Sequence, residues 1–330
     1  MTLILREDDV RTLLTMPMAL EAVETVFQRL ADSSAVNHPR QRLHPPGQAY
    51  LHYMAAADST GGAMGLKMYT SSRQGLRFLI PLFDAQNGEL LALIAADYLG
   101  QMRTGAASGV ATRLMSRPDS RRIGILGTGL QARTQLEAIA QVRHLKSVRV
   151  YGRNAERRAR FAAEMNAKLG ISVEAVETPE GAVREMDIVT TATTSTDPEL
   201  LGRWLAPGTH VNAIGANFPH KRELDAEAVN RAEIIAADSI AQSREEAGDL
   251  IHALAEKPDG WNRVVELAEI VAGRRSGRDN PDQITLFKSN GIAIEDIVTA
   301  ERVYAAAMEK EIGQSIDLWP SKTGSETGKR

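Results

Sequence analysis

The sequence predicts an α/β protein that combines a Rossmann-type, doubly wound parallel sheet with a second, α+β part. Three observations support this fold class. From Arg122 onwards, apolar strand patterns alternate with helical patterns. The first of these strands runs into a glycine-rich turn that begins a helix. Residues 40–98 differ, because several extended apolar runs follow one another there without a helix between them.

The N-terminal part is expected to form two helices and then a set of strands. Residues 6–35 contain two successive helical patterns, and Pro17 suits the first turn of the second helix. That helix has one apolar face, formed by Leu20, Val23, Phe27 and Leu30. Strands are expected within residues 49–55, 62–70 and 78–99. The last of these runs is broken by "QNGE", a strong hairpin-turn signal.

The alternating region follows a helix expected over residues 101–116 and the polar boundary "RPDSRR". Asn154 should cap one helix of this region, and Gly170 should lie just past its end. The expected strands lie within residues 121–129, 147–153, 171–178, 187–195, 210–217 and 232–238. The expected helices lie at residues 130–142, 154–170, 179–186, 244–255 and 261–272, with a long last helix from about Gly291. The small, polar tail 321–330 is expected to be disordered.

Composition and charge exclude several classes of protein. The formal net charge is −3 with both signs mixed along the chain, which argues against nucleic-acid binding. No stretch approaches the roughly 20 apolar residues of a membrane helix, and the N-terminal apolar run is too short for a signal peptide. The chain has no cysteine, so disulfides, thiolate nucleophiles and cysteine-ligated zinc are excluded. We therefore expect a cytoplasmic protein without a membrane or nucleic-acid partner.

The segment "GTGLQA" matches the dinucleotide-binding pattern G-x-G-x-x-A. Its first glycine allows the tight turn, its second lets the backbone approach a pyrophosphate, and its small third position lets helix and strand pack closely. The phosphates would bind the free N–H groups at the start of the following helix. A bare turn is the alternative interpretation. The expected cofactor contacts are Gly127, Thr128, Gly129, Leu130, Gln131 and Ala132.

The end of the second strand bears on which dinucleotide is bound. NAD sites usually carry Asp or Glu there for the ribose 2′-hydroxyl. This chain has Gly152, Arg153 and Asn154 instead. An arginine without a neighbouring acid favours a 2′-phosphate, so NADP(H) is favoured and NAD(H) is the alternative. Arg153 could also be merely solvated, with Asn154 only capping its helix.

Basic residues outside the glycine turn interrupt apolar patterns or follow a parallel strand. They are Arg40, Arg42, Lys67, Arg103 and Lys221. Lys67 lies in the middle of "GAMGLKMYT", where a solvated lysine is less expected than a functional cation. Several cations beside a nicotinamide would suit a small carboxylate substrate, although each could also be a solvated edge residue. The seven histidines show no metal-ligand spacing, so no metal site is expected.

Segments spread over nearly the whole chain resemble the ornithine cyclodeaminase/μ-crystallin family. They are "GLKMYT", "QMRTGAASGVATRLMSR", "IGILGTGLQARTQLEAI", "VNAIGANFPHKRELD", "REEAGDLI" and "LFKSNGIAIEDIV". The resemblance implies a homodimer. It also implies a substrate-binding and dimerisation domain at residues 1–118, completed by residues 296–320, and an NAD(P)-binding domain at residues 119–295.

The resemblance assigns roles to several residues. Lys67 and Arg103 correspond to the family residues that bind the substrate carboxylate region, and a further family arginine falls on Arg40 or Arg42. It also implies further cofactor contacts at Thr104, Thr193, Gly215, Ser289 and Gly291.

Asn217 departs from part of the family. Cyclodeaminases and an alanine dehydrogenase of the family carry an aspartate at this position, whereas an amide cannot exchange a proton near neutral pH. The resemblance is therefore nearer to the ketimine reductases. We expect NAD(P)H-dependent reduction of a small cyclic α-imino acid to an L-amino acid, with Lys67 donating to the imine and Asn217 orienting its nitrogen. The alternatives are cyclodeamination of ornithine with bound NAD, and non-catalytic binding of a small ligand.

Overall fold

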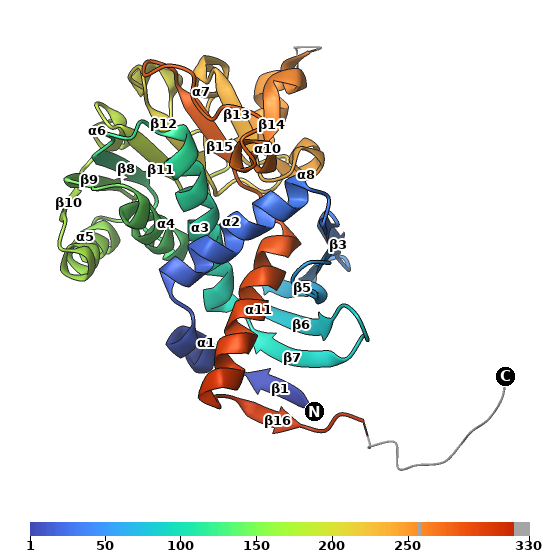
Figure 1. The fold of residues 1–330 in the computed structure, drawn as a ribbon. Helices are drawn as coiled ribbons and strands as arrows, with labels where there is room; N and C mark the ends of the chain where they lie inside the picture. The colour runs from blue at the N-terminus through green and yellow to red at the C-terminus, as the bar shows by residue number, and fades with distance from the viewer. Residues whose placement is uncertain (256–258, 320–330) are drawn as a thin grey trace, which may run out of the picture.

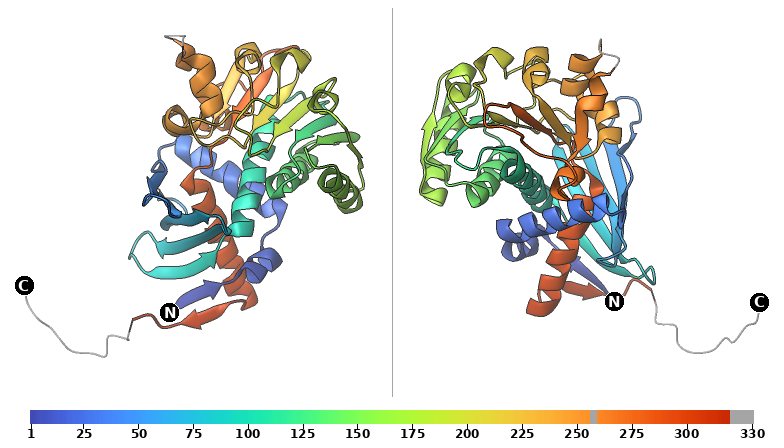
Figure 2. Two further views of the ribbon diagram at one scale, coloured as in Figure 1. Left: turned by 180° about the vertical axis from the view of Figure 1, so that it is seen from behind. Right: turned by 45° about the horizontal axis from the view of Figure 1, so that its top comes forward.

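The computed structural model describes residues 1–255 and 259–319, whose strands form two eight-stranded sheets. The predicted α/β fold class is confirmed. In Figure 1 the sheets lie in different halves of the molecule, and helix α3 (Asp97–Met115) runs from one to the other. Figure 2 shows the chain start beside the last strand, at the end of the molecule away from the second sheet. The expected disordered tail, residues 321–330, lies outside the described residues.

The first sheet is largely antiparallel and has the strand order β16-β1-β7-β6-β5-β4-β2, with β3 paired to β4. Among the described pairs, β1 and β7 alone run parallel. Its strands are β1 (Thr2–Leu5), β2 (Ala35–Asn37), β3 (Gln41–Leu43), β4 (Tyr50–Asp58), β5 (Ala63–Ser72), β6 (Gly75–Asp84), β7 (Leu90–Ala95) and β16 (Gln314–Ile316). The "QNGE" turn joins β6 to β7, as predicted.

Helices cover one face of the first sheet. Burial alternates along β4 and β5, so His52, Met54, Lys67 and Tyr69 share the covered face. The covering helices are α1 (Glu7–Leu13), α2 (Met16–Ala31) and α11 (Ala293–Lys310), which with the sheet form one apolar core. Because β16 and α11 come from the end of the chain, the first sheet and its covering helices include residues that follow the second sheet in sequence.

The second sheet is parallel throughout its described pairs and has the order β10-β9-β8-β11-β12-β15-β13-β14. Its strands are β8 (Arg122–Leu126), β9 (Ser147–Tyr151), β10 (Ser172–Ala175), β11 (Ile188–Thr191), β12 (His210–Ala213), β13 (Ile234–Ala237), β14 (Val264–Glu266) and β15 (Thr285–Lys288). The strand order reverses between β8 and β11. Doubly wound sheets bind ligands beyond the carboxyl ends of the strands at such a switch point.

Short connections and helices link the parallel strands. The helices are α4 (Leu130–Val142), α5 (Ala155–Leu169), α6 (Pro179–Val183), η1 (Gly202–Trp204), α7 (Ala226–Arg231), α8 (Ile240–Glu246), α9 (Gly248–Leu254), η2 (Gly260–Arg263) and α10 (Leu267–Val271). The boundaries of α5 are those predicted: the side chain of Asn154 accepts the N–H of Arg157, and Gly170 ends the helix in the left-handed conformation.

The helix expected from residue 101 begins earlier, at Asp97. The carboxylate of Glu7, from α1, accepts the backbone N–H groups of Asp97 at 2.5 Å and of Tyr98 at 3.1 Å. This cap comes from a segment distant in sequence, so the local pattern does not reveal it. As a result Arg103 lies in the second turn of α3, buried, and not at the start of the helix.

The predictions of helices at residues 244–255 and 261–272 are also wrong in part. Ser239 caps α8, which begins at Ile240, four residues before the expected start at residue 244. Ala247 separates α8 from α9. In the second case residues 264–266 extend the sheet as β14, parallel to β13. Two adjacent valines favour the strand there, and α10 follows it as a single short helix. Among the described residues, none of the helices is long and apolar enough to span a membrane.

Candidate active site

The glycine turn has the geometry that its sequence predicted. Gly127 has φ +113°, and a Cβ there would lie 2.4 Å from the carbonyl oxygen of Ala192. Gly129 is the N-cap of α4, where no described side chain caps the helix, and a Cβ on Gly129 would meet no described atom within 4 Å. Ala132 is completely buried against the sheet. Uncapped N–H groups facing open space fit the pyrophosphate of a dinucleotide.

The end of β9 lies against this turn. A Cβ on Gly152 would come within 2.9 Å of the Thr128 side chain, so the two segments are in contact. Arg153 is exposed, and its guanidinium pairs with no other residue in the described ranges. Asn154 is occupied in capping α5. The adenosine end of a dinucleotide would therefore meet an arginine and no carboxylate at this strand.

Glu223 connects the loops that follow β11 and β12. Its carboxylate accepts the Thr191 hydroxyl at 2.9 Å and the backbone N–H groups of Thr193 at 2.5 Å and Gly215 at 2.6 Å. Burial raises the pKa of Glu223. A Cβ on Gly215 would lie 2.2 Å from the Thr193 carbonyl oxygen, so only glycine fits here. These contacts place Thr193 and Gly215 side by side at the carboxyl edge of the sheet.

Asp238 has the same role for the loop that follows β15. It accepts the Ser289 hydroxyl at 3.1 Å and the backbone N–H groups of Asn290 and Gly291, both at 2.7 Å. Gly291 has φ +76°, and a Cβ there would lie 2.7 Å from Nη1 of Arg103. The loop therefore runs directly against the guanidinium of Arg103.

Lys67 and Arg103 meet two acids in the first turn of α11. Lys67 Nζ donates to Asp296 Oδ2 at 2.8 Å, and Arg103 Nε donates to Asp296 Oδ1 at 3.1 Å. Arg103 Nη1 donates to Glu295 Oε2 at 2.7 Å. Burial, together with the nearby charge of Arg103, lowers the pKa of Lys67 to about 8, although Asp296 opposes this shift. Burial also raises the pKa of Glu295 to about 8.

Arg40 and Arg42 both pair with Glu246 of α8, but they differ in exposure. Arg40 also donates to the carbonyl oxygens of Asn290 at 2.9 Å and Gly291 at 3.1 Å, and its side chain is 3% exposed. Arg42 lies 3.2 Å from Glu246 and donates to the Asn217 carbonyl oxygen at 3.1 Å, and its side chain is 24% exposed. The guanidinium of Arg40 is thus buried in contacts with the protein, whereas part of the Arg42 side chain is accessible to a ligand.

Aromatic rings surround these cations. Arg42 and Lys221 each lie over the ring of Phe218, 4.6 Å and 5.1 Å from its centre. His52 stacks on Tyr69 with ring centres 4.3 Å apart. Burial and the charges of Arg42 and Arg40 lower the pKa of His52 to about 4, so the ring is neutral near pH 7.

The structure brings most of the predicted substrate residues together. Thr104, predicted as a cofactor contact, lies on α3 where it faces α4: its hydroxyl donates to the Gly100 carbonyl, and its own carbonyl accepts from Gln135. Sequence reasoning missed the acids that hold the site, namely Glu223, Asp238, Glu246, Glu295 and Asp296. A signal existed for the last two, since adjacent acids in the apolar run "GIAIEDIVTA" have no reason to face a core unless cations meet them.

The fold and this site define an oxidoreductase with a dinucleotide-binding turn beside a buried cationic cluster. The chain belongs to the ornithine cyclodeaminase/mu-crystallin family, whose sequence model matches residues 1–311. The resemblance seen in the sequence is thereby confirmed.

The similar proteins cover from 78% to 96% of the chain. Delta(1)-pyrroline-2-carboxylate reductase of Bacillus cereus is 36% identical over 264 residues, which cover 78% of this chain and 81% of that protein. The solved structure of the Thermococcus litoralis Delta(1)-pyrroline-2-carboxylate reductase, in complex with NADH and L-proline, has a TM-score of 0.92 and 36% identity, covering 96% of this chain and 100% of that one. An archaeal alanine dehydrogenase dimer with bound NAD has a TM-score of 0.91 and 33% identity, covering 96% and 99%.

Glu246 is predicted to stabilise the site. Replacing it by glutamine (Glu246→Gln) leaves two arginines beside a neutral, buried side chain, so we expect the free energy of unfolding to fall by about 3 kcal/mol. Urea unfolding of the purified protein measures this change. The matched control is Glu245→Gln, one residue earlier on the same helix, where the side chain is exposed. Equal stability of the Glu246→Gln and Glu245→Gln variants would contradict the importance of the buried pair.

Proposed function

We propose that this protein uses NAD(P)H to reduce a small cyclic α-imino acid to the L-amino acid. The observation that carries the proposal is the cluster of Arg40, Arg42, Lys67 and Arg103 with Glu246, Glu295 and Asp296. Within the described residues these four cations form ion pairs with three carboxylates, and Arg42 keeps an accessible edge that suits the carboxylate of a small substrate.

Each residue has a part in the proposed reaction. Arg103 and the accessible edge of Arg42 would bind the substrate carboxylate. Lys67 would donate a proton to the imine nitrogen, for which a pKa of about 8 is well matched to neutral pH. The amide of Asn217 would orient that nitrogen without exchanging a proton, and Lys221 would lie at the outer side of the pocket. A dihydronicotinamide held at the glycine turn would supply the hydride for the substrate carbon.

The proposed cofactor is NADP(H), with NAD(H) as the alternative. The uncapped start of α4 with open space at Gly129 supports a dinucleotide, and exposed Arg153 without a neighbouring acid supports a 2′-phosphate. Two solved relatives contain NADH and NAD. The preference for the 2′-phosphate of NADP(H) therefore rests on Arg153 alone. We propose further contacts from Thr193, Gly215, Ser289 and Gly291.

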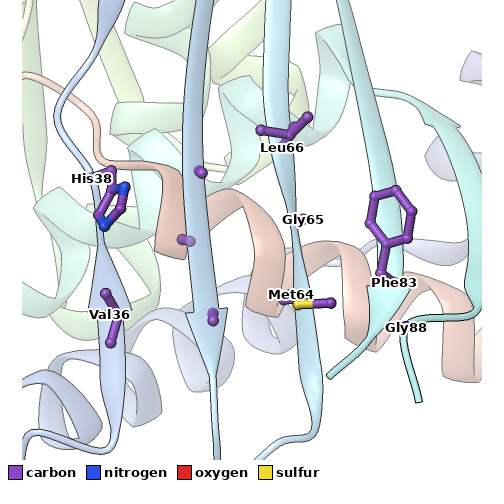
Figure 3. Close-up of a pocket in the computed structure, with 10 residues that line it drawn as sticks. Val36, His38, Met64, Gly65, Leu66, Phe83 and Gly88 are labelled. Atoms are coloured by element: carbon purple, nitrogen blue, oxygen red, sulfur yellow. The ribbon is translucent and has the colours of Figure 1, made fainter. Parts of the chain in front are cut away.

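We also propose a homodimer, with the substrate domain formed by residues 1–118 and 296–320 and the nucleotide domain by residues 119–295. The uncovered face of the first sheet supports this arrangement. It holds an apolar groove of about 480 Å³, and α11 lies behind the strands (Figure 3). Lys67 lies on the opposite face of β5 from the exposed Leu66. Val36, Leu43, Tyr53, Leu66 and Leu79, all large side chains, are exposed on the uncovered face. The alanine dehydrogenase relative was solved as a dimer.

The proposed partner is therefore a small imino or amino acid, and not a nucleic acid or a membrane. The mixed charge and the net −3 support this view. The cytoplasm is the compartment we propose, on the strength of the cysteine-free sequence.

The function is tested by NADPH and NADH oxidation with Δ1-pyrroline-2-carboxylate and Δ1-piperideine-2-carboxylate. We expect turnover of at least one of them, and a fall in kcat/KM of about 100-fold or more in Lys67→Met, because the proton donor is lost. Lys146→Met, in the loop before β9, is the control for loss of a lysine. Absence of turnover with both imines, together with ammonia release from ornithine, would instead establish cyclodeamination. Tight ligand binding without either reaction would favour the non-catalytic alternative.

The cofactor preference is tested by Arg153→Ala. We expect KM for NADPH to rise about tenfold while KM for NADH changes little, because one charge-assisted contact to the 2′-phosphate is lost. Arg160→Ala, on the exposed surface of α5, is the control and should leave both values unchanged. A parallel change in the two KM values of Arg153→Ala would show that this residue does not select the phosphate.

A further inference from the structure

We propose that Asp296 is a positioning residue that aims the ammonium of Lys67 and keeps it protonated for the reaction, while Glu295 serves only the neighbouring arginine. This inference rests on the proposed function, because it concerns the proton that the imine nitrogen receives. It adds a division of labour between two adjacent acids of α11, neither of which is expected to touch the substrate.

The contacts of Asp296 connect three elements. Its Oδ2 accepts from Lys67 Nζ of β5 at 2.8 Å, and its Oδ1 accepts from Arg103 Nε of α3 at 3.1 Å. The side chains of Lys67 and Asp296 are 3% and 1% exposed. One carboxylate therefore fixes the lysine and the arginine relative to each other. A hydrogen-bonded ammonium in this position loses most of its rotational freedom, which is the effect of positioning.

A glycine on β5 allows this approach. Gly65 precedes Lys67 by two residues and faces the same side of the sheet. A Cβ on Gly65 would lie 2.8 Å from Cδ1 of Ile297, the residue after Asp296 on α11. A residue of β2 also holds the start of α11, because the side chain of Asn37 accepts the backbone N–H of Ile294 at 3.1 Å. The close packing of α11 on β5 is what brings the carboxylate within reach of Lys67.

The charges around Lys67 explain why the counter-ion is needed. Arg103 faces it from α3, Arg40 faces it from the segment before β3, and the ring of Phe78 on β6 lies 5.6 Å from Nζ. Burial and the two guanidinium groups lower the pKa of Lys67, and Asp296 is the group that raises it. Removing the charge of Asp296 therefore lowers this pKa below about 8, so the lysine loses its proton at a lower pH.

Glu295 provides an internal comparison. Its carboxylate accepts from Nη1 of Arg103 at 2.7 Å, and among the described contacts it makes none with Lys67. It is fully buried, like Asp296, and lies in the same turn of α11. Replacing Glu295 by glutamine should therefore disturb the hold on Arg103, and with it the binding of a carboxylate, without moving the titration of Lys67.

The experiment compares the pH profiles of kcat/KM for the wild type, Asp296→Asn and Glu295→Gln with both cyclic imines. Because protonated Lys67 is the competent form, wild-type activity should fall as pH rises through about 8. In Asp296→Asn this basic limb should move down by about one pH unit or more. In Glu295→Gln the limb should stay in place while KM rises. Asp296→Glu, which restores the charge, should return the limb to the wild-type position with a lower kcat.

A second measurement tests the role of Asp296 independently of turnover and of any titration of the substrate. The Nζ chemical shift of Lys67 in ¹⁵N-lysine-labelled protein, assigned with Lys67→Arg, gives its pKa without any turnover. A wild type that reduces neither imine overturns the proposed function, and the chemical shifts still decide the role of Asp296. The inference is wrong if the pH of the basic limb changes with the imine used and the pKa of Lys67, read from its Nζ chemical shift, is the same in Asp296→Asn as in the wild type. Asp296→Ser is the second neutral variant should the asparagine variant not fold.

Discussion

The buried ion pairs between α11 and the cations of β5 and α3 are the contact on which the rest of the structure depends. Charges taken out of water are costly unless each has a partner, so Lys67 and Arg103 can occupy the interior only because Glu295 and Asp296 meet them there. These acids come from the end of the chain. The first sheet, the helix that leaves it and the last helix must therefore assemble together before the site exists.

The same principle shapes the edge of the second sheet. Asp238 and Glu223 hold its loops through backbone N–H groups and hydroxyls. Glu246 holds Arg40 against the loop after β15 and Arg42 against the loop after β12. Buried carboxylates thus hold both the loops and the cations of the site, and Gly127 of the glycine turn packs against the segment that Glu223 binds. Because protein acids already engage the cations, their geometry is set before a substrate arrives, which lowers the cost of ordering them on binding.

Local pattern predicted the parallel sheet, the glycine turn and α5, because each depends on neighbouring residues: alternation, a left-handed glycine, an asparagine cap. Local pattern failed where a contact with a residue distant in sequence determines the secondary structure. Glu7 starts α3 early, and pairing with β13 turns residues 264–266 into a strand. The cations of the site were predicted as interruptions of apolar runs. Asp296 was not: its place in an apolar run indicates that a cation meets it, but only the structure shows that this cation is Lys67, 2.8 Å away and distant in sequence.

The central claim is that this cluster binds the carboxylate of an imino acid and presents its nitrogen to Lys67. The most direct measurement is a crystal structure with L-proline and NADP⁺. We predict the proline carboxylate on Arg103 and Arg42, its nitrogen within hydrogen-bonding distance of Lys67 Nζ, and its Cα toward the nicotinamide. A carboxylate bound away from both arginines, or a nitrogen turned away from Lys67, would contradict the account.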